Sequence, residues 1–512
     1  MTQPGDVNAG VGTTAIFVLL LLIAVSFRLP WFFQDVIDWD ESVFILVGDA
    51  LAHGHLPYTL VWDNKPPLGF AFFAFIIAFL PDSLAFVRFG GAVLVALSAL
   101  LVFRIATGLM GRRAAFLAAT FFIIAVSVLV SSGPAVMMEH VALMPLLGAL
   151  SLIDNKTSSH GRLLVIGVLL GAATMVRTNL AYVLLSVLLL LPFAHAHRSL
   201  RERALVTVYI ASGSLIVFGA IFLVYAVNGY GKLLVDSAIR VPLAYSESAL
   251  GYLDVGKAML GSAFRFGWQG AVVGLQWVLN ALFWVAGLAG VALLVVMERH
   301  RNAASTMILV FLAATLLSIL SSGYPWGHYL LQLAPFFAIG AGLVVSTAIL
   351  NLKRSWLVVI IGATVIGFTA DNVGVYRVML MSHAKDGEVY RGVNFELARY
   401  LRNVSEPEDT LFTTDDILLY WLMDTYPVVP VAAFPANLWM EQAVLKPLYG
   451  PAATTEAVLE EIVSRQPTRI ILPEGRVGSR GDIDTRQAFP RELLDDYHLE
   501  RVVAGRLIYR RD

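Results

Sequence analysis

Long apolar runs in the first 370 residues constrain the fold more than any other feature of this sequence. A transmembrane helix needs about 20 consecutive, mostly apolar residues. Such runs lie near residues 13–29, 84–103, 114–131, 136–153, 204–227, 272–297, 305–321, 329–350 and 356–370. The run 163–194 is too long for one crossing and short for two, and Arg177 lies at its middle. We therefore predict a hairpin with Arg177 at its tip, and about eleven transmembrane helices in all.

The composition supports a polytopic membrane protein. Of the 512 residues, 58% are hydrophobic and only 14% are charged, which is too few to cover the surface of a soluble protein of this length. An ordinary soluble enzyme and a disordered chain are thereby excluded. The net charge of −1 offers no basic surface typical of nucleic-acid binding, so we expect no nucleic-acid partner. The chain has no cysteine, which excludes disulfides and thiolate metal ligands.

The density of charge changes near residue 371. Residues 371–512 contain 16 Lys or Arg and 22 Asp or Glu, whereas the preceding 370 residues contain only 20 and 15. We therefore predict a transmembrane domain over 1–370 and a soluble domain over 371–512. In the second domain, the pattern predicts helices at 390–401 and 455–463 and strands at 410–414, 428–434, 469–472 and 501–509. Alternating helices and strands predict a small α/β domain.

Basic residues give the orientation of the transmembrane domain. Cytoplasmic loops carry an excess of Lys and Arg. One set of loops holds twelve of the 20 Lys and Arg residues of this part, whereas the short turns after 131 and 321 on the opposite side hold none: Arg104, Arg112, Arg113, Lys156, Arg162, Arg198, Arg201, Arg203, Arg299, Arg301, Lys353 and Arg354 lie in the first set. With these loops in the cytoplasm, the N-terminus is cytoplasmic, and the long loops 30–83 and 228–270 and the domain 371–512 are extracytoplasmic. Within the first loop, the apolar run 68–80 has only 13 residues and predicts a helix lying in the membrane interface.

The loop 30–83 concentrates acidic residues beside aromatic ones. Its centre contains Asp38, Asp40 and Glu41, followed by Asp63 and Lys65. Adjacent carboxylates at a membrane surface favour a site that holds one ionised acid as a base, with its pKa raised toward a working range by partial desolvation. The alternative is a solvated loop whose Trp and Tyr residues belong to the aromatic belt of the membrane interface.

Four segments in order resemble one glycosyltransferase family. They are Asp40-Glu41 with Asp63-Asn64-Lys65-Pro66-Pro67-Leu68, then 133–140 ending in Glu139-His140, then 171–177 ending in Arg177, then 328–335 beginning with His328-Tyr329. Together they resemble the dolichyl-phosphate-mannose protein mannosyltransferase-like superfamily, which has the GT-C fold. The similarity extends to its bacterial branch, which includes the lipid A aminoarabinose transferases.

The resemblance implies an integral membrane glycosyltransferase. Family members move one sugar from a polyprenyl-phosphate carrier to an acceptor on the outer face of the membrane, with inversion. It therefore implies a polyprenyl-phosphate-linked sugar donor, a lipid or glycan acceptor and surrounding membrane lipids as partners. For the bacterial branch it implies an inner (plasma) membrane location. No cofactor is required, although a divalent metal ion is possible in the family.

By the same resemblance, Asp40 corresponds to the family's catalytic base. Asp38 and Glu41 remain alternatives for the working acid, and Glu41 could instead orient a neighbouring helix or hold the sugar. Asp40 could also simply cap the following helix. Lys65 corresponds to a lysine that contacts the carrier phosphate, and the alternative is an ammonium reaching the lipid headgroups.

The later segments imply the remaining site residues. Glu139 occupies the second-acid position, where it could bind acceptor, sugar or metal, and His140 and His328 could join it. Any metal would take Glu139 and His328 as ligands. Arg177 is costly inside a membrane unless it faces a cavity or a partner, so we expect it to contact the carrier phosphate or a sugar carboxylate, or to pair with Glu139. Lone histidines at helix ends are also common structural residues.

Three further residues are weaker candidates for binding the donor. Arg240 and Arg265 lie in the second long loop and could contact phosphate, although a solvated amphipathic loop is the default. Tyr329 belongs to an aromatic stretch that could stack on a sugar or form part of the interfacial belt.

The main alternative function is a polyprenyl-linked sugar flippase or a secondary transporter. Transporters place functional charges on broken helices in mid-membrane, often in paired repeats. Here the acids concentrate in a loop outside the membrane, and only Arg177 fits a transport residue.

Overall fold

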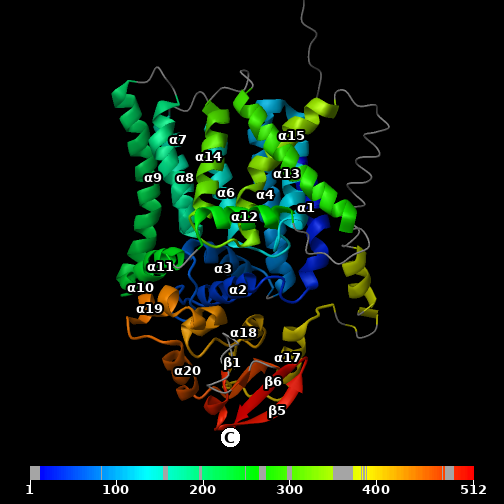
Figure 1. The fold of residues 1–512 in the computed structure, drawn as a ribbon, viewed down its shortest axis with the longest axis vertical. Coiled ribbons are helices and arrows are strands. Elements are labelled where there is room, and N and C mark those ends of the chain that lie inside the picture. The colour runs from blue at the N-terminus through cyan, green and yellow to red at the C-terminus, as the bar shows by residue number, and fades with distance from the viewer. Residues whose placement is uncertain are drawn as a thin grey trace, which may run out of the picture.

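The computed structural model describes residues 12–81, 83–153, 159–194, 199–247, 250–264, 273–296, 303–349, 373–381, 383–384, 387, 389–474, 477–478 and 489–512. Long helices form a bundle in the upper half of Figure 1, and the C-terminal residues form a separate layer beneath it. Between the two lie helices that run across the ends of the bundle.

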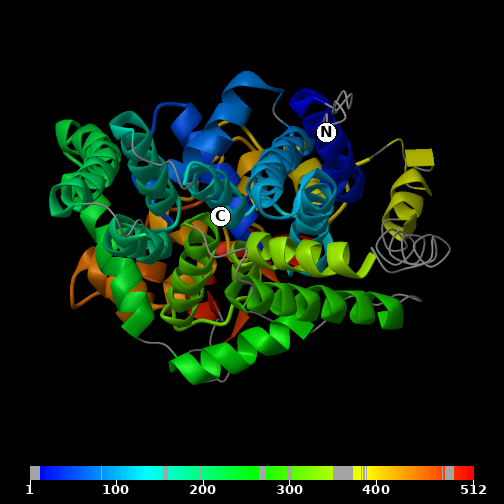
Figure 2. The same cartoon turned by 90° about the horizontal axis from the view of Figure 1, so that it is seen from above.

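The bundle follows the predicted apolar runs. Its helices are α1 (Thr13–Arg28), α4 (Leu84–Met110), α5 (Arg112–Ile124), α6 (Met138–Ser151), α7 (His160–Val176), α8 (Ala181–Leu190), α9 (Leu200–Val227), α13 (Val273–Val296), α14 (Ala303–Leu320) and α15 (Ala334–Ile349). Figure 2 shows the molecule from above, with many of these helices seen along or close to their axes. Five of the described helices are long and apolar enough to span a membrane, and the other apolar helices are shorter. The chain is thus a multi-pass membrane protein, while the count of eleven stays a prediction because 356–370 lies outside the described residues.

Small residues let neighbouring bundle helices approach closely. A Cβ on Gly167 of α7 would lie 2.1 Å from the Ile210 carbonyl oxygen of α9, and one on Gly213 would lie 2.2 Å from the Leu164 carbonyl oxygen. Membrane helices associate through such close backbone packing because lipid supplies no hydrophobic drive between them. The predicted hairpin also forms: α7 ends at Val176 with Arg177 as its C-cap, and a single 3₁₀ turn, Thr178–Leu180, leads into α8.

The first long loop folds into helices beneath the bundle. It contains α2 (Trp39–Ala52) and α3 (Phe70–Phe79), and a 3₁₀ turn over Pro67–Gly69 precedes α3, so the helix predicted at 68–80 is present. The second long loop contributes α10 (Gly231–Val235), α11 (Val241–Glu247) and α12 (Tyr252–Phe264). Helix α2 is buried along most of its length, against α3 above and the C-terminal layer below (Figure 1).

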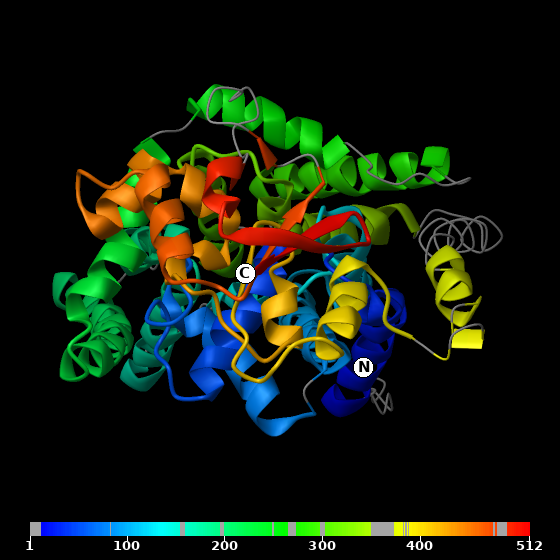
Figure 3. The ribbon, with the colours of Figure 1, turned by 90° about the horizontal axis from the view of Figure 1, so that it is seen from below.

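The C-terminal layer is a small α/β domain. Its four-stranded sheet has the order β1 (Leu411–Thr413), β2 (Arg469–Pro473), β6 (Arg506–Arg511), β5 (Tyr497–Val503), in which only β1 and β2 are parallel. The short strands β3 (Val477–Gly478) and β4 (Phe489–Pro490) pair separately. The helices are α17 (Val393–Arg402), α18 (Leu418–Leu422), α19 (Lys446–Tyr449) and α20 (Thr455–Ser464). Figure 3 shows the β5–β6 hairpin crossing the underside of the molecule.

Two strand predictions in this domain are wrong. The segment 428–434 contains a 3₁₀ turn, Pro430–Ala433, because proline removes a backbone donor that a strand needs. The single strand predicted at 501–509 is instead a hairpin. Ala504 and Gly505 both have positive φ and reverse the chain between β5 and β6. Strands β1 and β2 and helices α17 and α20 agree with the prediction.

The C-terminal domain is docked on the first loop by hydrogen bonds. The Asp35 Oδ2 atom accepts from the backbone N–H of Asn394 at 2.9 Å, and the Tyr426 hydroxyl donates to Asp49 Oδ2 at 2.6 Å. The Trp62 N–H donates to the carbonyl of Pro430 at 3.0 Å. These hydrogen bonds hold the C-terminal domain against the first loop, on the side of the loop away from the bundle.

Candidate active site

The start of α2 positions the first acid of the site. Asp38 is the N-cap of this helix, and its side chain accepts from the Asp40 backbone N–H at 3.0 Å. Asp38 also accepts from the Ser132 hydroxyl, which ties the cap to the loop before α6. Asp is a favoured N-cap because its carboxylate satisfies backbone donors of the first turn. Asp38 rather than Asp40 is thus the capping residue, and the side chain of Asp40 is left for another role.

Lys65 brings a positive charge to Asp40. Its Nζ lies 3.8 Å from Asp40 Oδ2 and 3.6 Å from Asp63 Oδ1, and it donates to Asn64 Oδ1 at 2.7 Å. The Tyr58 hydroxyl donates to the Lys65 carbonyl at 2.6 Å and so fixes the backbone. The Lys65 side chain is 16% exposed, so it is largely withdrawn from solvent.

A second ion pair lies between the bundle helices. Arg177 Nη2 lies 3.0 Å from Glu139 Oε1, and both side chains are buried. The guanidinium lies 5.0 Å from the centre of the Tyr329 ring, within cation–π range. His328 Nε2 lies 3.8 Å from the same Glu139 oxygen. Four residues from three separate segments therefore converge at the ends of α6 and α7.

Electrostatics join the two groups into one cluster. Burial raises the pKa of Asp40, but the charges of Lys65, His328 and Arg177 outweigh burial and hold the pKa below its usual value. Burial and the neighbouring Asp40 carboxylate raise the pKa of Asp38. The expectation of a base with a raised pKa is therefore wrong for Asp40, because the nearby cations favour its ionised form more than burial disfavours it.

Glu41 lies outside this cluster. Its Oε2 pairs with Arg88 Nη2 at 2.6 Å, and its Oε1 accepts from the Val136 N–H at 2.7 Å. Arg88 also donates to the carbonyls of Trp31, Gln34 and Asp35. Glu41 holds α2 against α4 and the 130–136 loop, in line with the alternative that it orients a neighbouring helix, and a catalytic role for it stays an untested prediction.

This buried pair predicts a loss of stability. We expect Glu41→Ala to cost about 3–5 kcal/mol, because it leaves Arg88 charged and buried without its carboxylate. Thermal unfolding of the detergent-solubilised protein measures the effect. A matched control is Asp254→Ala, which breaks an exposed pair with Lys257 at 3.5 Å and should change little. Equal midpoints for the two variants would contradict the assignment.

Two other candidates do not join the cluster, and a third cannot be placed because it lies outside the described residues. His140 Nδ1 accepts from the Met137 N–H, and its Nε2 contacts the carbonyl of Val126 at 3.2 Å, so His140 stabilises the start of α6. Arg240 pairs with Asp236 one turn earlier, at 2.7 Å, on a helix surface where its side chain is 60% exposed. Arg265 lies outside the described residues.

The cluster offers a poor donor set for a divalent metal. Among the described residues, no group of three or more His, Asp or Glu side chains is arranged to hold a metal ion. Glu139 and His328 supply two possible ligands, but Arg177 already lies 3.0 Å from the nearer Glu139 oxygen. A guanidinium at that distance repels a dication. Metal dependence stays an untested prediction, and the geometry here does not favour it.

Two buried arginines, Arg28 and Arg88, shape the site but were not among the residues predicted from the sequence. Arg28 at the end of α1 donates to the carbonyls of Gly133 and Ala135 at 2.5 and 3.0 Å, and so shapes the loop before Glu139. Arg88 does the same for the loop before Asp40. Arginine inside an otherwise apolar run is a signal for both, because such a charge needs internal partners.

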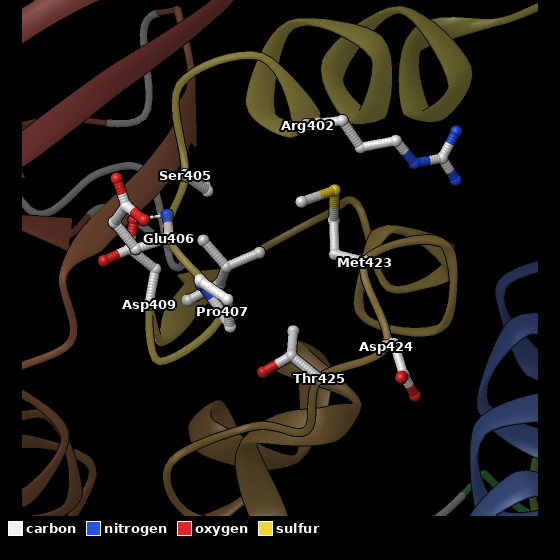
Figure 4. A pocket seen from close by; sticks show the side chains of 9 residues that line it. Arg402, Ser405, Glu406, Pro407, Asp409, Met423, Asp424 and Thr425 are labelled. Atoms are coloured by element: carbon white, nitrogen blue, oxygen red, sulfur yellow. Dashed lines mark hydrogen bonds between the residues drawn. The ribbon is translucent and has the colours of Figure 1, made fainter.

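A cleft of about 240 Å³ lies in the C-terminal domain, apart from this cluster. Its walls come from the end of α17, the loop that leads from α17 into β1, and the loop after α18 (Figure 4). Figure 4 shows the Arg402 side chain directed away from Asp409, and Asp409 accepts from the Glu406 N–H at 3.1 Å. Asp40, Lys65 and Arg177 do not line this cleft, so it is not part of the candidate active site.

Comparisons with known proteins give a family match and a shared fold. The sequence model of the dolichyl-phosphate-mannose-protein mannosyltransferase family matches residues 64–225, which include Lys65, Glu139 and Arg177. A search of curated proteins finds no match.

Solved structures with the same fold include ArnT from Cupriavidus metallidurans. Its apo form matches with a TM-score of 0.57 at 13% identity, covering 97% of each chain. Its complex with undecaprenyl phosphate matches at 0.59 and 14%, covering 98% of each. The archaeal oligosaccharyltransferase AglB from Archaeoglobus fulgidus, in complex with an inhibitory peptide and a dolichol-phosphate, matches at 0.50 and 13%, covering 90% of this chain and 69% of that one. At these identities the structural matches establish the fold alone.

Proposed function

We propose a function from one premise: this chain is a GT-C-fold protein of the dolichyl-phosphate-mannose protein mannosyltransferase-like superfamily. It transfers a single sugar from a polyprenyl-phosphate carrier to an acceptor, with inversion at the anomeric carbon. The acceptor is a lipid or a glycan on the extracytoplasmic side of the cell's inner membrane. ArnT with bound undecaprenyl phosphate supports a polyprenyl-phosphate carrier for this chain as well.

One observation carries the proposal: a carboxylate and two cations share a partly buried cluster at the end of the bundle. Asp40 Oδ2 lies 3.8 Å from Lys65 Nζ. Burial raises the pKa of Asp40, and the charges of Lys65 and Arg177 both lower it. A phosphodiester needs cations for its departing charge, and an acceptor hydroxyl needs a base. Both requirements are met within one site.

In the proposed reaction, the Asp40 carboxylate takes the proton of the acceptor hydroxyl. The acceptor oxygen forms a bond to the anomeric carbon as the bond from that carbon to the phosphate oxygen breaks. The electron pair leaves with the polyprenyl phosphate, and Lys65 and Arg177 stabilise its charge. Glu139 holds Arg177 in place, and Tyr329 packs against the guanidinium.

The layer beneath the bundle supports an acceptor that approaches from that side. Helix α2, which carries Asp40, lies between the bundle and the C-terminal domain (Figure 1). By the distribution of Lys and Arg, this side is extracytoplasmic and the N-terminus is cytoplasmic. The C-terminal domain then takes part in choosing the acceptor.

The test is sugar transfer by the purified full-length protein in liposomes. A panel of undecaprenyl-phosphate sugars is offered with membrane extract as acceptor, and release of undecaprenyl phosphate is measured together with the sugar gained by the acceptor. We expect one donor to be consumed in proportion to the product formed. If no donor is consumed while the carrier lipid moves between leaflets, the transferase proposal is wrong and the flippase alternative replaces it.

A further inference from the structure

A group of uncharged polar side chains lies inside the bundle next to Arg177. Asn179 is the second residue of the 3₁₀ turn Thr178–Leu180. Its Nδ2 donates to Gln332 Oε1 at 3.0 Å and to Ser318 Oγ at 3.0 Å. Thr178 precedes Asn179, and Thr315 lies one turn before Ser318 on α14. These five residues, which we call the amide cluster, come from the α7–α8 turn, α14 and the segment leading into α15.

Hydrogen bonding within the amide cluster is incomplete. Four of its polar atoms are buried and have no hydrogen-bond partner in the protein: Thr178 Oγ1, Asn179 Oδ1, Thr315 Oγ1 and Gln332 Nε2. Gln332 and Thr315 are both 0% exposed. Buried polar groups in native proteins nearly always have a partner, so each exception calls for an explanation. Four exceptions on neighbouring side chains indicate that the partner is a molecule the cluster binds.

The amide cluster is continuous with the phosphate-binding residues. Tyr329 and Gln332 both lie in the 3₁₀-helix Gly327–Gln332, and residues three apart in such a helix lie on the same side, about 6 Å apart along its axis. Tyr329 contacts the Arg177 guanidinium, and Thr178 and Asn179 follow Arg177 directly. A group attached to a phosphate held by Arg177 and Lys65 is therefore within reach of the cluster.

From this geometry we propose that the amide cluster binds the hydroxyl groups of the donor sugar, and that Asn179 and Gln332 select the sugar. The proposal rests on the function proposed above. A sugar hydroxyl both donates and accepts a hydrogen bond. The unpaired Asn179 Oδ1 can only accept and the unpaired Gln332 Nε2 can only donate, so the two match a pair of neighbouring hydroxyls. Thr178 and Thr315 can serve either role.

The chemistry of the amide cluster also defines the class of sugar. Its five members carry no charge, and Arg177, the cation that precedes Thr178, is committed to Glu139 at 3.0 Å and, in the proposed reaction, to the carrier phosphate. A carboxylate on the part of the sugar that enters the cluster would lose its hydration without gaining a cation. The donor sugar is therefore neutral at these positions, such as an unmodified hexose or pentose, rather than a uronic acid.

The test compares donors with the bare carrier. The double variant Asn179→Leu/Gln332→Leu removes both amides and leaves neither one unpaired. We expect it to bind undecaprenyl phosphate as wild type does. Its KM for the sugar-bearing donor should rise at least tenfold, and the differences in kcat/KM among neutral undecaprenyl-phosphate sugars should become smaller. Each lost hydrogen bond contributes a factor of about ten or less, so a larger combined loss requires both amides to contact the sugar.

A matched control is Asn280→Leu. Asn280 is also a buried amide in the bundle, but its Nδ2 donates to the Ala263 carbonyl and its Oδ1 accepts from Trp284, so both ends are satisfied by the protein. It should lower the unfolding temperature and leave the donor preference unchanged. If the double variant keeps the wild-type KM and preference and only changes the unfolding temperature, the amide cluster is structural or holds water, and this inference is overturned.

The two proposals fail in different ways. If wild-type protein consumes no undecaprenyl-phosphate sugar, the function itself is wrong. If wild type transfers sugar and the double variant does so with unchanged selectivity, only the role of the amide cluster is wrong. Transfer of an undecaprenyl-phosphate uronic acid as efficiently as of the corresponding neutral hexose would also overturn the assignment to a neutral sugar.

Discussion

Replacing Asp40 by asparagine is expected to lower kcat for sugar transfer by about 10² to 10⁴-fold, the usual contribution of a positioned general base. The substitution keeps the size and polarity of the side chain and removes only its ability to take a proton. Binding of undecaprenyl phosphate should be retained or become tighter, because Lys65 loses a competing carboxylate at 3.8 Å. Single-turnover transfer and binding to the bare carrier separate the two effects.

The control for this substitution lies on the same helix. Asp49→Asn changes an acid in the last turns of α2, where it accepts a hydrogen bond from Tyr426, and leaves the cluster intact. Its transfer rate should stay within a fewfold of wild type. If Asp40→Asn retains wild-type kcat, another group is the base and the proposed mechanism fails. Weaker carrier binding with unchanged kcat would instead make Asp40 a binding residue.

The pH dependence provides an independent check on Asp40. Burial raises the pKa of this carboxyl, but Lys65, His328 and Arg177 outweigh it and hold the pKa below its usual value, so in the free protein Asp40 stays ionised as the pH falls. The acid limb of kcat/KM, which reports the free enzyme, should therefore lie below the ordinary aspartate range near 3.9. Once the donor phosphate pairs with the cations, they lower the pKa less, and the acid limb of kcat should move to higher pH. Asp40→Asn should lose this limb.

Replacing Arg177 by glutamine is expected to affect stability and donor binding together. Glu139 is fully buried and pairs with Arg177 at 3.0 Å, so its carboxylate would be left without the guanidinium. Removing one partner of a buried ion pair costs about 3–5 kcal/mol. The same substitution removes one of the two cations proposed for the carrier phosphate. We expect a large fall in the unfolding temperature and loss of undecaprenyl phosphate binding.

A double variant separates these two consequences. Arg177→Gln/Glu139→Gln replaces both charges with amides and should recover most of the unfolding temperature, because no buried charge remains unpaired. Binding of the carrier should not recover, because the phosphate still lacks its guanidinium. If carrier binding returns in the double variant, Arg177 acts only as the structural partner of Glu139. Arg177→Lys retains a positive charge but not the planar fork, and should recover binding only in part.

The apolar runs determined the membrane class and the positions of the helices. Hydropathy and length are local properties, and a bilayer admits only apolar segments long enough to cross it with their backbone hydrogen bonds satisfied. The concentration of Asp38, Asp40 and Glu41 with Lys65 in one loop was likewise evident from the sequence, but the sequence did not identify Asp38 as the N-cap. The strands at 428–434 and 501–509 were predicted wrongly because apolar residues indicate burial but do not specify the backbone conformation. A proline sets the 3₁₀ turn in the first segment, and an Ala-Gly turn divides the second into two strands.

The roles of the charged residues were decided by tertiary structure. In the sequence Asp40 and Glu41 are equivalent neighbours, yet one helical step turns Glu41 toward Arg88 and Asp40 toward Lys65. The fall in the pKa of Asp40 depends on charges from three distant segments, and the pairing of Arg177 with Glu139 depends on how α6 and α7 pack. Asn179 and Gln332 meet although they are 153 residues apart. Apolar periodicity specifies which residues are buried. Which buried polar groups contact one another depends on how distant segments pack, and no local sequence pattern contains that information.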